Sequence, residues 1–382
     1  MKKAFYLGLV ALVLFEFFKV YFIMPFPGSQ RMNSLDFAYF LHSYRWPIRI
    51  VLLVLLVVGA RSAFQVKRKW VPAVFTLLLL VVGYYFNFKM TAEKIFKEPK
   101  QLVFKPKGEN ILGDSTVVVA VSLGGQTKAY PVRYIVYHHQ VQDEVGGKPL
   151  LITYCSVCRT GRVFEPLVKG EPETFRLVGM DHFNAMFEDV TTKSWWRQVN
   201  GEAVTGKLKG EMLPEAESFQ LTVAKLFQLY PDAQVMQPDL TALADLKYDT
   251  LGKYEYGRSK GDLTRTDSLS WQDKSWVVGV EVEGVSKAYD WNQLKAERVL
   301  NDKIKNTAIV IALAADNQSY AVFKRSDTAQ FSVRNDTLVA GLQAFDFSGR
   351  ALQGGESLQR LNAYQEFWHS WRTFHPGTER YE

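Results

Sequence analysis

Residues 150–166 read LLITYCSVCRTGRVFEP and contain both cysteines of the chain, Cys155 and Cys158. An apolar β-type run, LLITY, precedes the pair, and Arg-Thr-Gly follows it as a turn signal before the next run, RVF. The pattern predicts a strand, a tight turn and a second strand. Two cysteines at this spacing can close a disulfide or hold one metal ion, and both chemistries need a thiolate.

The β pattern around this stretch occurs twice in the chain. Residues 117–164 align with residues 276–323 at a constant shift of 159, with 11 identities in 48 positions. This regularity predicts two related β-rich units, at 90–236 and 276–382, with a linker at 237–275. Two units are too few for a solenoid, so we expect them to pack as a pseudo-symmetric pair around one core.

The two predicted units differ where the first carries reactive side chains. At the shift of 159, Cys155 corresponds to Ala314 and Cys158 corresponds to Asn317. The second unit therefore keeps the hydrophobic pattern without the thiols. We expect function to be concentrated in the first unit.

The segment that precedes these units is apolar and basic. Residues 1–89 hold 11 Lys and Arg against 2 acidic residues, whereas residues 90–382 hold 35 against 37. The net charge of +7 thus comes from the N-terminal segment, and the remainder has no electrostatic footprint for nucleic acid. Apolar stretches at about 4–24, 47–64 and 70–88 approach the roughly 20 residues that a helix needs to cross a bilayer. The lipid bilayer is therefore an expected partner.

Positive charges predict the orientation of the three helices. Lys2 and Lys3 precede the first, and four basic residues lie between the second and third, at 61–69. The positive-inside rule places both groups in the cytoplasm, so residues 90–382 lie outside it. The expected fold class is α+β, with three N-terminal transmembrane helices followed by a β-rich extracytoplasmic domain built from two related units.

Charged residues also occur within the apolar stretches. Glu16 and Lys19 are three positions apart and share a helix face, so they predict an intramembrane ion pair with a functional role. The structural alternative is that Lys19 reaches the interface and Glu16 packs against another helix. Arg49 is expected to extend towards the membrane surface.

Three interpretations of the cysteine pair remain open. Outside the cytoplasm such a pair forms a disulfide unless something keeps it reduced, which favours a thiol redox protein with an oxidoreductase-like activity and a thiol or electron-transfer partner. Arg159 then supplies positive charge to the thiolate. The alternative is a Zn or Cu site completed by His138 or His139 together with His182. The third is a structural disulfide in a membrane-tethered interaction module.

A second segment carries paired tryptophans. Residues 189–206 read DVTTKSWWRQVNGEAVTG. As a structural element the segment is a strand and turn that fills the core. As a functional element it offers Trp196 as an aromatic wall and Gln198 as a polar group to a pocket.

These two segments resemble a known family. Residues 130–166, together with FRLVGMDHFNAMFEDVTTKSWWRQVNGEAVTG at 175–206, are similar to the domain-of-unknown-function 3179 family. The resemblance is strong over about 115–236 and weaker in the second unit. The chain departs from the family pattern at Ser156, where the family has proline, and at His139, where it usually has an acid.

The resemblance implies particular site residues. It assigns the family's histidine to His138, its cysteines to Cys155 and Cys158, its aspartate to Asp189 and its glutamine to Gln198. Some members carry selenocysteine in the Cys-x-x-Cys, which implies redox or strongly nucleophilic chemistry. The first cysteine is then the attacking thiol, the second the resolving thiol, and the histidine a base or ligand.

Overall fold

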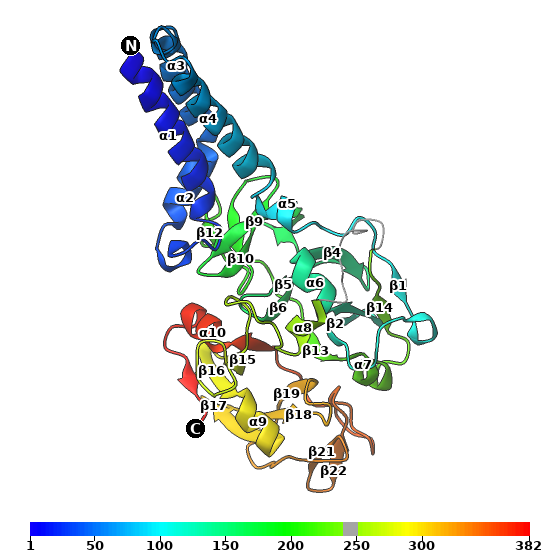
Figure 1. The fold of residues 1–382 in the computed structure, drawn as a ribbon. Coiled ribbons are helices and arrows are strands. Elements are labelled where there is room, and N and C mark those ends of the chain that lie inside the picture. Colours follow the sequence, from blue (N-terminus) through cyan, green and yellow to red (C-terminus); the bar gives the residue numbers. More distant parts are fainter. Residues whose placement is uncertain (240–250) are drawn as a thin grey trace. The chain divides into compact units, whose positions relative to one another are not determined.

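The computed structural model describes residues 1–239 and 251–382, and the chain packs into two compact units (Figure 1). Unit 1 comprises residues 1–97, 173–197 and 202–212. Unit 2 comprises residues 98–172, 198–201 and 213–382. Of the expected linker at 237–275, residues 240–250 lie outside the described residues.

Unit 1 contains three long apolar helices, α1 (Lys2–Tyr21), α3 (Arg45–Phe64) and α4 (Trp70–Phe88). Each is long and apolar enough to cross a membrane. The three expected stretches thus form helices, although the first ends at Tyr21 because the following residues turn. α1 packs against both α3 and α4 (Figure 1). A Cβ at Gly59 would lie 2.3 Å from the Phe5 amide nitrogen, so this glycine permits the close approach of α1 and α3.

A polar cluster joins these three helices. Glu16 accepts hydrogen bonds from Lys19 Nζ at 3.0 Å and from Arg49 Nε at 2.6 Å. Asn87 of α4 donates to Glu16 at 2.8 Å and accepts from Arg49 at 2.7 Å. The expectation that Arg49 extends towards the membrane surface is therefore wrong. The guanidinium stays between the helices, because the carboxylate of Glu16 balances its charge there.

The rest of unit 1 is an antiparallel sheet with two short helices. The strands are β9 (Phe175–Asp181), β10 (Asn184–Asp189), β11 (Trp195–Arg197) and β12 (Ala203–Thr205), and the helices are α2 (Leu35–Ser43) and α5 (Ala92–Ile95). The strand order is β12-β11-β10-β9. Met180 N donates to Ile23 O at 2.8 Å, so the sheet is anchored to the segment that follows α1.

Unit 2 consists of the part of the chain before the undescribed residues, which we call the first half, and the part after them, the second half. The first half contains β1 (Phe104–Lys105), β2 (Val117–Leu123), β3 (Gln126–Pro131), α6 (Val132–His138), β4 (Gln140–Val145), β5 (Lys148–Cys155), β6 (Thr160–Phe164), β7 (Leu167–Val168), β8 (Glu171–Pro172), β13 (Phe219–Thr222), α7 (Val223–Leu229) and β14 (Gln234–Met236).

The second half begins with a short helix and repeats this element order. It contains α8 (Gly252–Glu255), β15 (Trp276–Val282), β16 (Val285–Asp290), α9 (Trp291–Glu297), β17 (Val299–Ile304), β18 (Thr307–Leu313), β19 (Tyr320–Lys324), β20 (Ser332–Arg334), β21 (Thr337–Ala340), β22 (Gln343–Phe345), β23 (Ala363–Phe367), α10 (Trp368–Phe374) and β24 (Glu379–Arg380).

The sheets of the two halves have corresponding strand orders. One sheet reads β1-β14-β3-β2-β13 and its counterpart reads β24-β16-β15-β23. In both sheets a C-terminal strand pairs in parallel, β14 with β3 and β24 with β16. Each half also has a three-stranded sheet, β4-β5-β6 or β17-β18-β19. The β-rich part of the chain and the N-terminal helices together confirm the mixed α+β class.

A lysine, a tyrosine and an aspartate that are identical at the shift of 159 make the same contacts in both halves. Tyr130 donates to Asp143 at 2.7 Å, and Tyr289 donates to Asp302 at 2.7 Å. In each half the lysine two positions before the tyrosine pairs with the same carboxylate, at 3.0 and 2.7 Å. The identities therefore mark a network that ties β3 to β4 and β16 to β17.

The two halves also cover each other's loops. β6 lies against β23, and β13 lies against β19. Phe367 N donates to Cys158 O at 2.9 Å, and Thr222 N donates to Ser319 Oγ at 2.9 Å. The second half therefore closes over the cysteine loop of the first.

One glycine explains a packing difference between the halves. A Cβ at Gly279 of β15 would lie 2.2 Å from Trp371 of α10. The position 159 residues earlier is Ala120, which packs in one cluster with the smaller Leu226. We expect Gly279→Ala to lower the free energy of unfolding by about 3 kcal/mol, because the rigid indole cannot move aside. Urea denaturation measures this loss.

A double variant supplies the control. Gly279→Ala with Trp371→Leu reproduces the pairing found in the first half. We expect its loss of stability to be smaller than the sum of the two single losses, because the added methyl group then has room. Strictly additive losses would contradict this account of the packing.

Candidate functional site

The loop between β5 and β6 carries both cysteines. Cys155 is the last residue of β5, opposite Thr160 of β6, and Cys158 lies in the turn between them. Arg159 closes the turn with a φ of 58°. Both cysteine side chains are fully buried, and both are free thiols. The predicted strand, turn and strand are present.

The two thiols interact directly. Burial raises the pKa of Cys158 well above its usual value, and the hydrogen bond with Cys155 raises it further. The nearby carboxyl of Glu366 raises it too, whereas the hydroxyl of Ser370 lowers it. Cys158 therefore keeps its proton near neutral pH and is placed to donate it to the Cys155 sulfur.

A cation from the second half faces this pair. The ammonium of Lys274 lies 3.0 Å from Val157 O, 2.7 Å from Leu263 O and 3.0 Å from His369 Nε2. A lysine has three N–H donors, so these acceptors use all of them. Burial lowers the pKa of Lys274, and the two cysteines raise it. Lys274 therefore binds the cysteine loop through Val157 O, and its charge interacts with the two thiols.

His369 lies against the Lys274 ammonium, which binds the loop. Burial and the charge of Lys274 lower the pKa of His369 to about 4, so its ring is neutral near pH 7. A neutral ring with its proton on Nδ1 leaves Nε2 able to accept from the ammonium. The same nitrogen lies 3.1 Å from Val157 O. An Nε2 that accepts from the ammonium has no proton to donate to Val157 O, so Lys274 is the group that holds the middle of the cysteine loop.

We expect acid to weaken the fold through three histidines, of which His139 is buried and His369 and His375 are half-buried. His139, His369 and His375 each have a pKa lowered by burial to about 4, against 6.5 for the ordinary side chain. Between these values the unfolded chain binds protons that the folded chain does not. The free energy of unfolding therefore falls as the pH drops from 6.5 to 4, by on the order of 1–3 kcal/mol per histidine.

Urea denaturation of the full chain across this pH range measures the effect. His375→Gln is the test variant, because its ring stacks on Trp371 without contacting the cysteine loop, with ring centroids 3.7 Å apart. We expect this variant to show a shallower pH dependence than the original chain. A free energy of unfolding that stays constant down to the lower pH would contradict the expectation.

Arg159, the expected thiolate stabiliser, binds other groups. Its guanidinium donates to two backbone carbonyls of α8 and to Gln365 Oε1, the last at 3.1 Å. It also lies 3.5 Å from the ring centroid of Trp276. These contacts tie the loop to the second half, so Lys274 fits the stabilising role better than Arg159 does.

Gln198 braces the two strands that hold the loop. Its side-chain amide donates to Thr153 Oγ1 at 3.0 Å and to Thr160 O at 3.2 Å. Thr153 lies on β5 and Thr160 begins β6, so the fully buried amide bridges both strands. The structure thus brings Gln198 to the frame of the cysteine site.

The histidine pair lies where α6 ends and β4 begins. His138 is the last residue of α6 and is fully buried, with its ring 5.3 Å from that of Tyr137. His139 follows with a φ of 60°, and its Nδ1 lies 2.8 Å from Tyr154 O. His139 therefore joins the end of the helix to β5, one residue before the first cysteine.

Asp189 and Trp196, the other expected pocket residues, lie in unit 1. Asp189 accepts a hydrogen bond from Trp196 Nε1 at 2.9 Å. It also accepts from the backbone amides of Thr192, Lys193 and Ser194. This carboxylate shapes a turn and fixes the buried indole.

The expected alternative was a metal site made by Cys155, Cys158 and His138. Residues 1–239 and 251–382 contain no group of three or more His, Cys, Asp or Glu side chains placed to hold a metal ion. Two sulfurs alone supply half of a tetrahedral zinc shell. The donor set in the described chain fits a pair of thiols better than a closed metal centre.

A family profile described as protein of unknown function, DUF3179, matches residues 100–378. The chain belongs to this family. The match confirms the resemblance that the Cys-x-x-Cys and its flanking residues indicate, and it extends through the second half of unit 2. No curated protein matches the chain. No solved structure matches it either.

The second half of this DUF3179 chain contributes side chains to the surroundings of the cysteine loop, and the sequence did not predict them. The sequence predicts that function is concentrated in the first repeat unit, at 90–236, whereas the structure also places residues of the second half around the cysteine loop: Lys274, Glu366, His369 and Ser370. Their separation in sequence from the cysteines exceeds 100 residues, so no local motif marks them. The internal repeat was the one signal, because two related halves are expected to share an interface.

Proposed function

We propose that this chain is a membrane-anchored thiol redox protein in which Cys155 and Cys158 cycle between a dithiol and a disulfide. One observation carries the proposal. Two free, buried thiols contact each other at the end of β5, with the Lys274 ammonium beside their loop. A positive charge near a cysteine favours the thiolate, which is the nucleophile in thiol–disulfide exchange.

The proposed oxidant is a disulfide in a partner molecule. The Cys155 thiolate attacks one sulfur of this disulfide, the S–S bond breaks, and the leaving partner sulfur takes up the proton that Cys155 lost. The Cys158 thiolate then attacks Cys155 in the mixed disulfide and releases the second partner thiol. The chain loses two electrons and two protons, and the partner disulfide gains them as two thiols.

Glu366 is the proposed acceptor of the Cys158 proton in the second step. It is fully buried, and burial raises its pKa, while Arg162 opposes that rise. A carboxylate with a raised pKa is a stronger base, which suits the removal of a proton from a thiol whose own pKa is raised. The proton then passes to the departing partner thiolate.

The burial of both sulfurs restricts which partners reach them. A small disulfide enters through local opening of the loop, and a protein disulfide needs a larger opening. Slow reaction with alkylating reagents in native buffer is therefore part of the proposal. The hydrogen bonds of Val157 O to Lys274 and of Phe367 N to Cys158 O are the contacts that such an opening breaks.

The same proposal includes the membrane topology and the duplication. α1, α3 and α4 anchor the chain, and residues 90–382 lie outside the cytoplasm. The basic residues at 61–69, between α3 and α4, support this orientation. The corresponding strand orders and the repeated Tyr–Asp hydrogen bonds support an origin of the two halves as related units.

Metal analysis combined with thiol counting tests redox chemistry against metal binding. The full chain is purified in detergent, its Zn and Cu contents are measured, and its thiols are alkylated after unfolding, before and after treatment with diamide. We expect no stoichiometric metal, two thiols before oxidation, none after it, and two again after reduction. Stoichiometric Zn or Cu that protects both sulfurs from diamide would instead establish the metal-binding alternative.

A further inference from the structure

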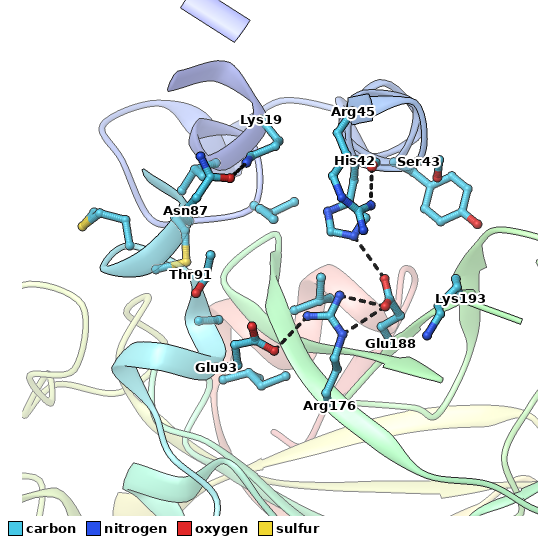
Figure 2. Close-up of a pocket in the computed structure, with 18 of the residues that line it drawn as sticks. Lys19, His42, Ser43, Arg45, Asn87, Thr91, Glu93, Arg176, Glu188 and Lys193 are labelled. Atoms are coloured by element: carbon cyan, nitrogen blue, oxygen red, sulfur yellow. Dashed lines mark hydrogen bonds and ion pairs between the residues drawn. The ribbon is translucent and has the colours of Figure 1, made fainter. Parts of the chain in front are cut away.

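A cavity in unit 1 lies where the three long helices come together (Figure 2). Its volume is 720 Å³. Lys19 near the end of α1, Arg45 at the start of α3 and Asn87 near the end of α4 all line it, so it adjoins one end of the helix bundle. Arg176 of β9 and Glu188 of β10 provide wall residues from the sheet.

The walls of this cavity carry an excess of positive charge. Five lysines and arginines line it against two glutamates: Lys19, Arg45, Arg176, Lys193 and Lys207 against Glu93 and Glu188. Arg176 already binds both glutamates, at 3.1 and 2.7 Å (Figure 2). Across the described part of the chain, no carboxylate forms an ion pair with Arg45, Lys193 or Lys207. Arg45 Nη1 donates to His42 O at 2.6 Å, which leaves its charge without a counter-ion, so no carboxylate among the described residues balances the charges of Arg45, Lys193 and Lys207.

The backbone conformation of Lys193 is unusual for a lysine and is held by hydrogen bonds from the turn to Asp189. Its φ is 61°, in the left-handed region that a lysine rarely adopts. Asp189 holds this conformation, because its carboxylate accepts from the amide of Lys193 at 3.1 Å and from that of Thr192. The turn thereby places Lys193 on the cavity wall, near Glu188 (Figure 2).

The remaining lining is suited to an amphiphile rather than to a small soluble anion. Apolar side chains make up much of it: Val20, Ile23, Met24, Tyr39, Leu177 and Val178. Beyond the cavity α3 and α4 present apolar side chains that are exposed along most of their lengths.

We propose that this cavity binds the phosphate headgroup of an anionic phospholipid. Arg45, Lys193 and Lys207 pair with the phosphate, the apolar wall contacts the glycerol and upper acyl carbons, and the acyl chains continue along the apolar helices. The inference rests on the proposed membrane insertion and is independent of the cysteine chemistry. A chain without reversible cysteine chemistry would therefore leave this inference standing, whereas a chain that does not insert into a membrane would not.

Lipid titration of the full chain in detergent tests this proposal. Dissociation constants are measured by calorimetry for a short-chain phosphatidylglycerol, for phosphatidylcholine with the same chains, and for inorganic phosphate. We expect phosphatidylglycerol to bind roughly tenfold more tightly than phosphatidylcholine, and Lys193→Gln and Lys207→Gln each to weaken it roughly fivefold.

Lys169→Gln is the matched control. Lys169 is also exposed and also has a left-handed backbone, with a φ of 54°, but it does not line the cavity. Equal affinities for the two lipids, or an equal loss in the control variant, would overturn the proposal. Inorganic phosphate that binds as tightly as phosphatidylglycerol would overturn the lipid assignment in favour of a soluble phosphate.

Discussion

Cys158→Ser should accumulate a stable mixed disulfide when the full chain is incubated with oxidised glutathione, whereas Cys155→Ser should form at least about tenfold less adduct in the same time. The difference follows from the site. Burial and the neighbouring sulfur hold the pKa of Cys158 high, so this residue is a poor nucleophile, while Cys155 receives its hydrogen bond. Intact-mass spectrometry after acid quenching measures the adduct.

The double variant Cys155→Ser/Cys158→Ser sets the background of this measurement. Ser156 lies between the cysteines, so Ser156→Ala controls for disturbance of the loop without touching a thiol. We expect Ser156→Ala to form the internal disulfide as the original chain does. Equal adduct levels in the two single cysteine variants would contradict the assignment of attacking and resolving roles.

Arg162→Met should cause the largest loss of stability of any single substitution near the site, about 3–5 kcal/mol. Arg162 is buried, 3.3 Å from Glu366 and 3.5 Å from Glu215, and its guanidinium carbon lies 3.2 Å from the ring centroid of Tyr364. The methionine fills the volume but leaves the carboxyl of Glu366 fully buried without its cation. Urea denaturation measures the loss.

Two variants identify the cause of that loss. Arg162→Met/Glu366→Gln removes both charges, so it should recover much of the stability of the single variant. Arg372→Met removes one partner of an ion pair with Asp273 in which both side chains are exposed, and it should cost under about 1 kcal/mol. A double variant no more stable than Arg162→Met would show that the buried carboxylate is not what destabilises the chain.

The elements with strong local patterns were predictable from the sequence. The long apolar runs predict α1, α3 and α4, because a helix satisfies its own backbone hydrogen bonds over such a length in lipid. Alternation and turn residues predict β5, the cysteine turn and β6. The identities at the shift of 159 indicate corresponding positions in the two halves, and Tyr130 and Tyr289 do make the same hydrogen bond to a carboxylate.

Interactions between distant segments were not predictable in this way. Arg49 appears in the sequence as a charge at the end of an apolar run, and only the packing of α1 against α3 brings Glu16 within 2.6 Å of it. Lys274 lies in a segment that is polar and rich in turn residues, a composition typical of a linker. Its contact with the cysteine loop forms only because the second half covers that loop. No local sequence pattern predicts this packing.

The candidate site illustrates the same limit. Residue types and the family resemblance singled out Cys155 and Cys158, and the structure places the two thiols in contact. They favoured Arg159 as the stabilising cation because it is adjacent in sequence. A residue next to a turn often points away from it, and here the guanidinium binds α8 and Gln365 instead. Spatial neighbours from the second half supply the charge.

A redox titration of the cysteine pair tests the central claim most directly. The full chain is equilibrated in detergent with glutathione buffers of increasing oxidised fraction, quenched with acid, alkylated after unfolding and weighed by mass spectrometry. The account predicts a reversible two-electron transition between a form with two free thiols and a form with none, reached from both directions. Two free thiols at every glutathione ratio, or oxidation that reduction does not reverse, would contradict it.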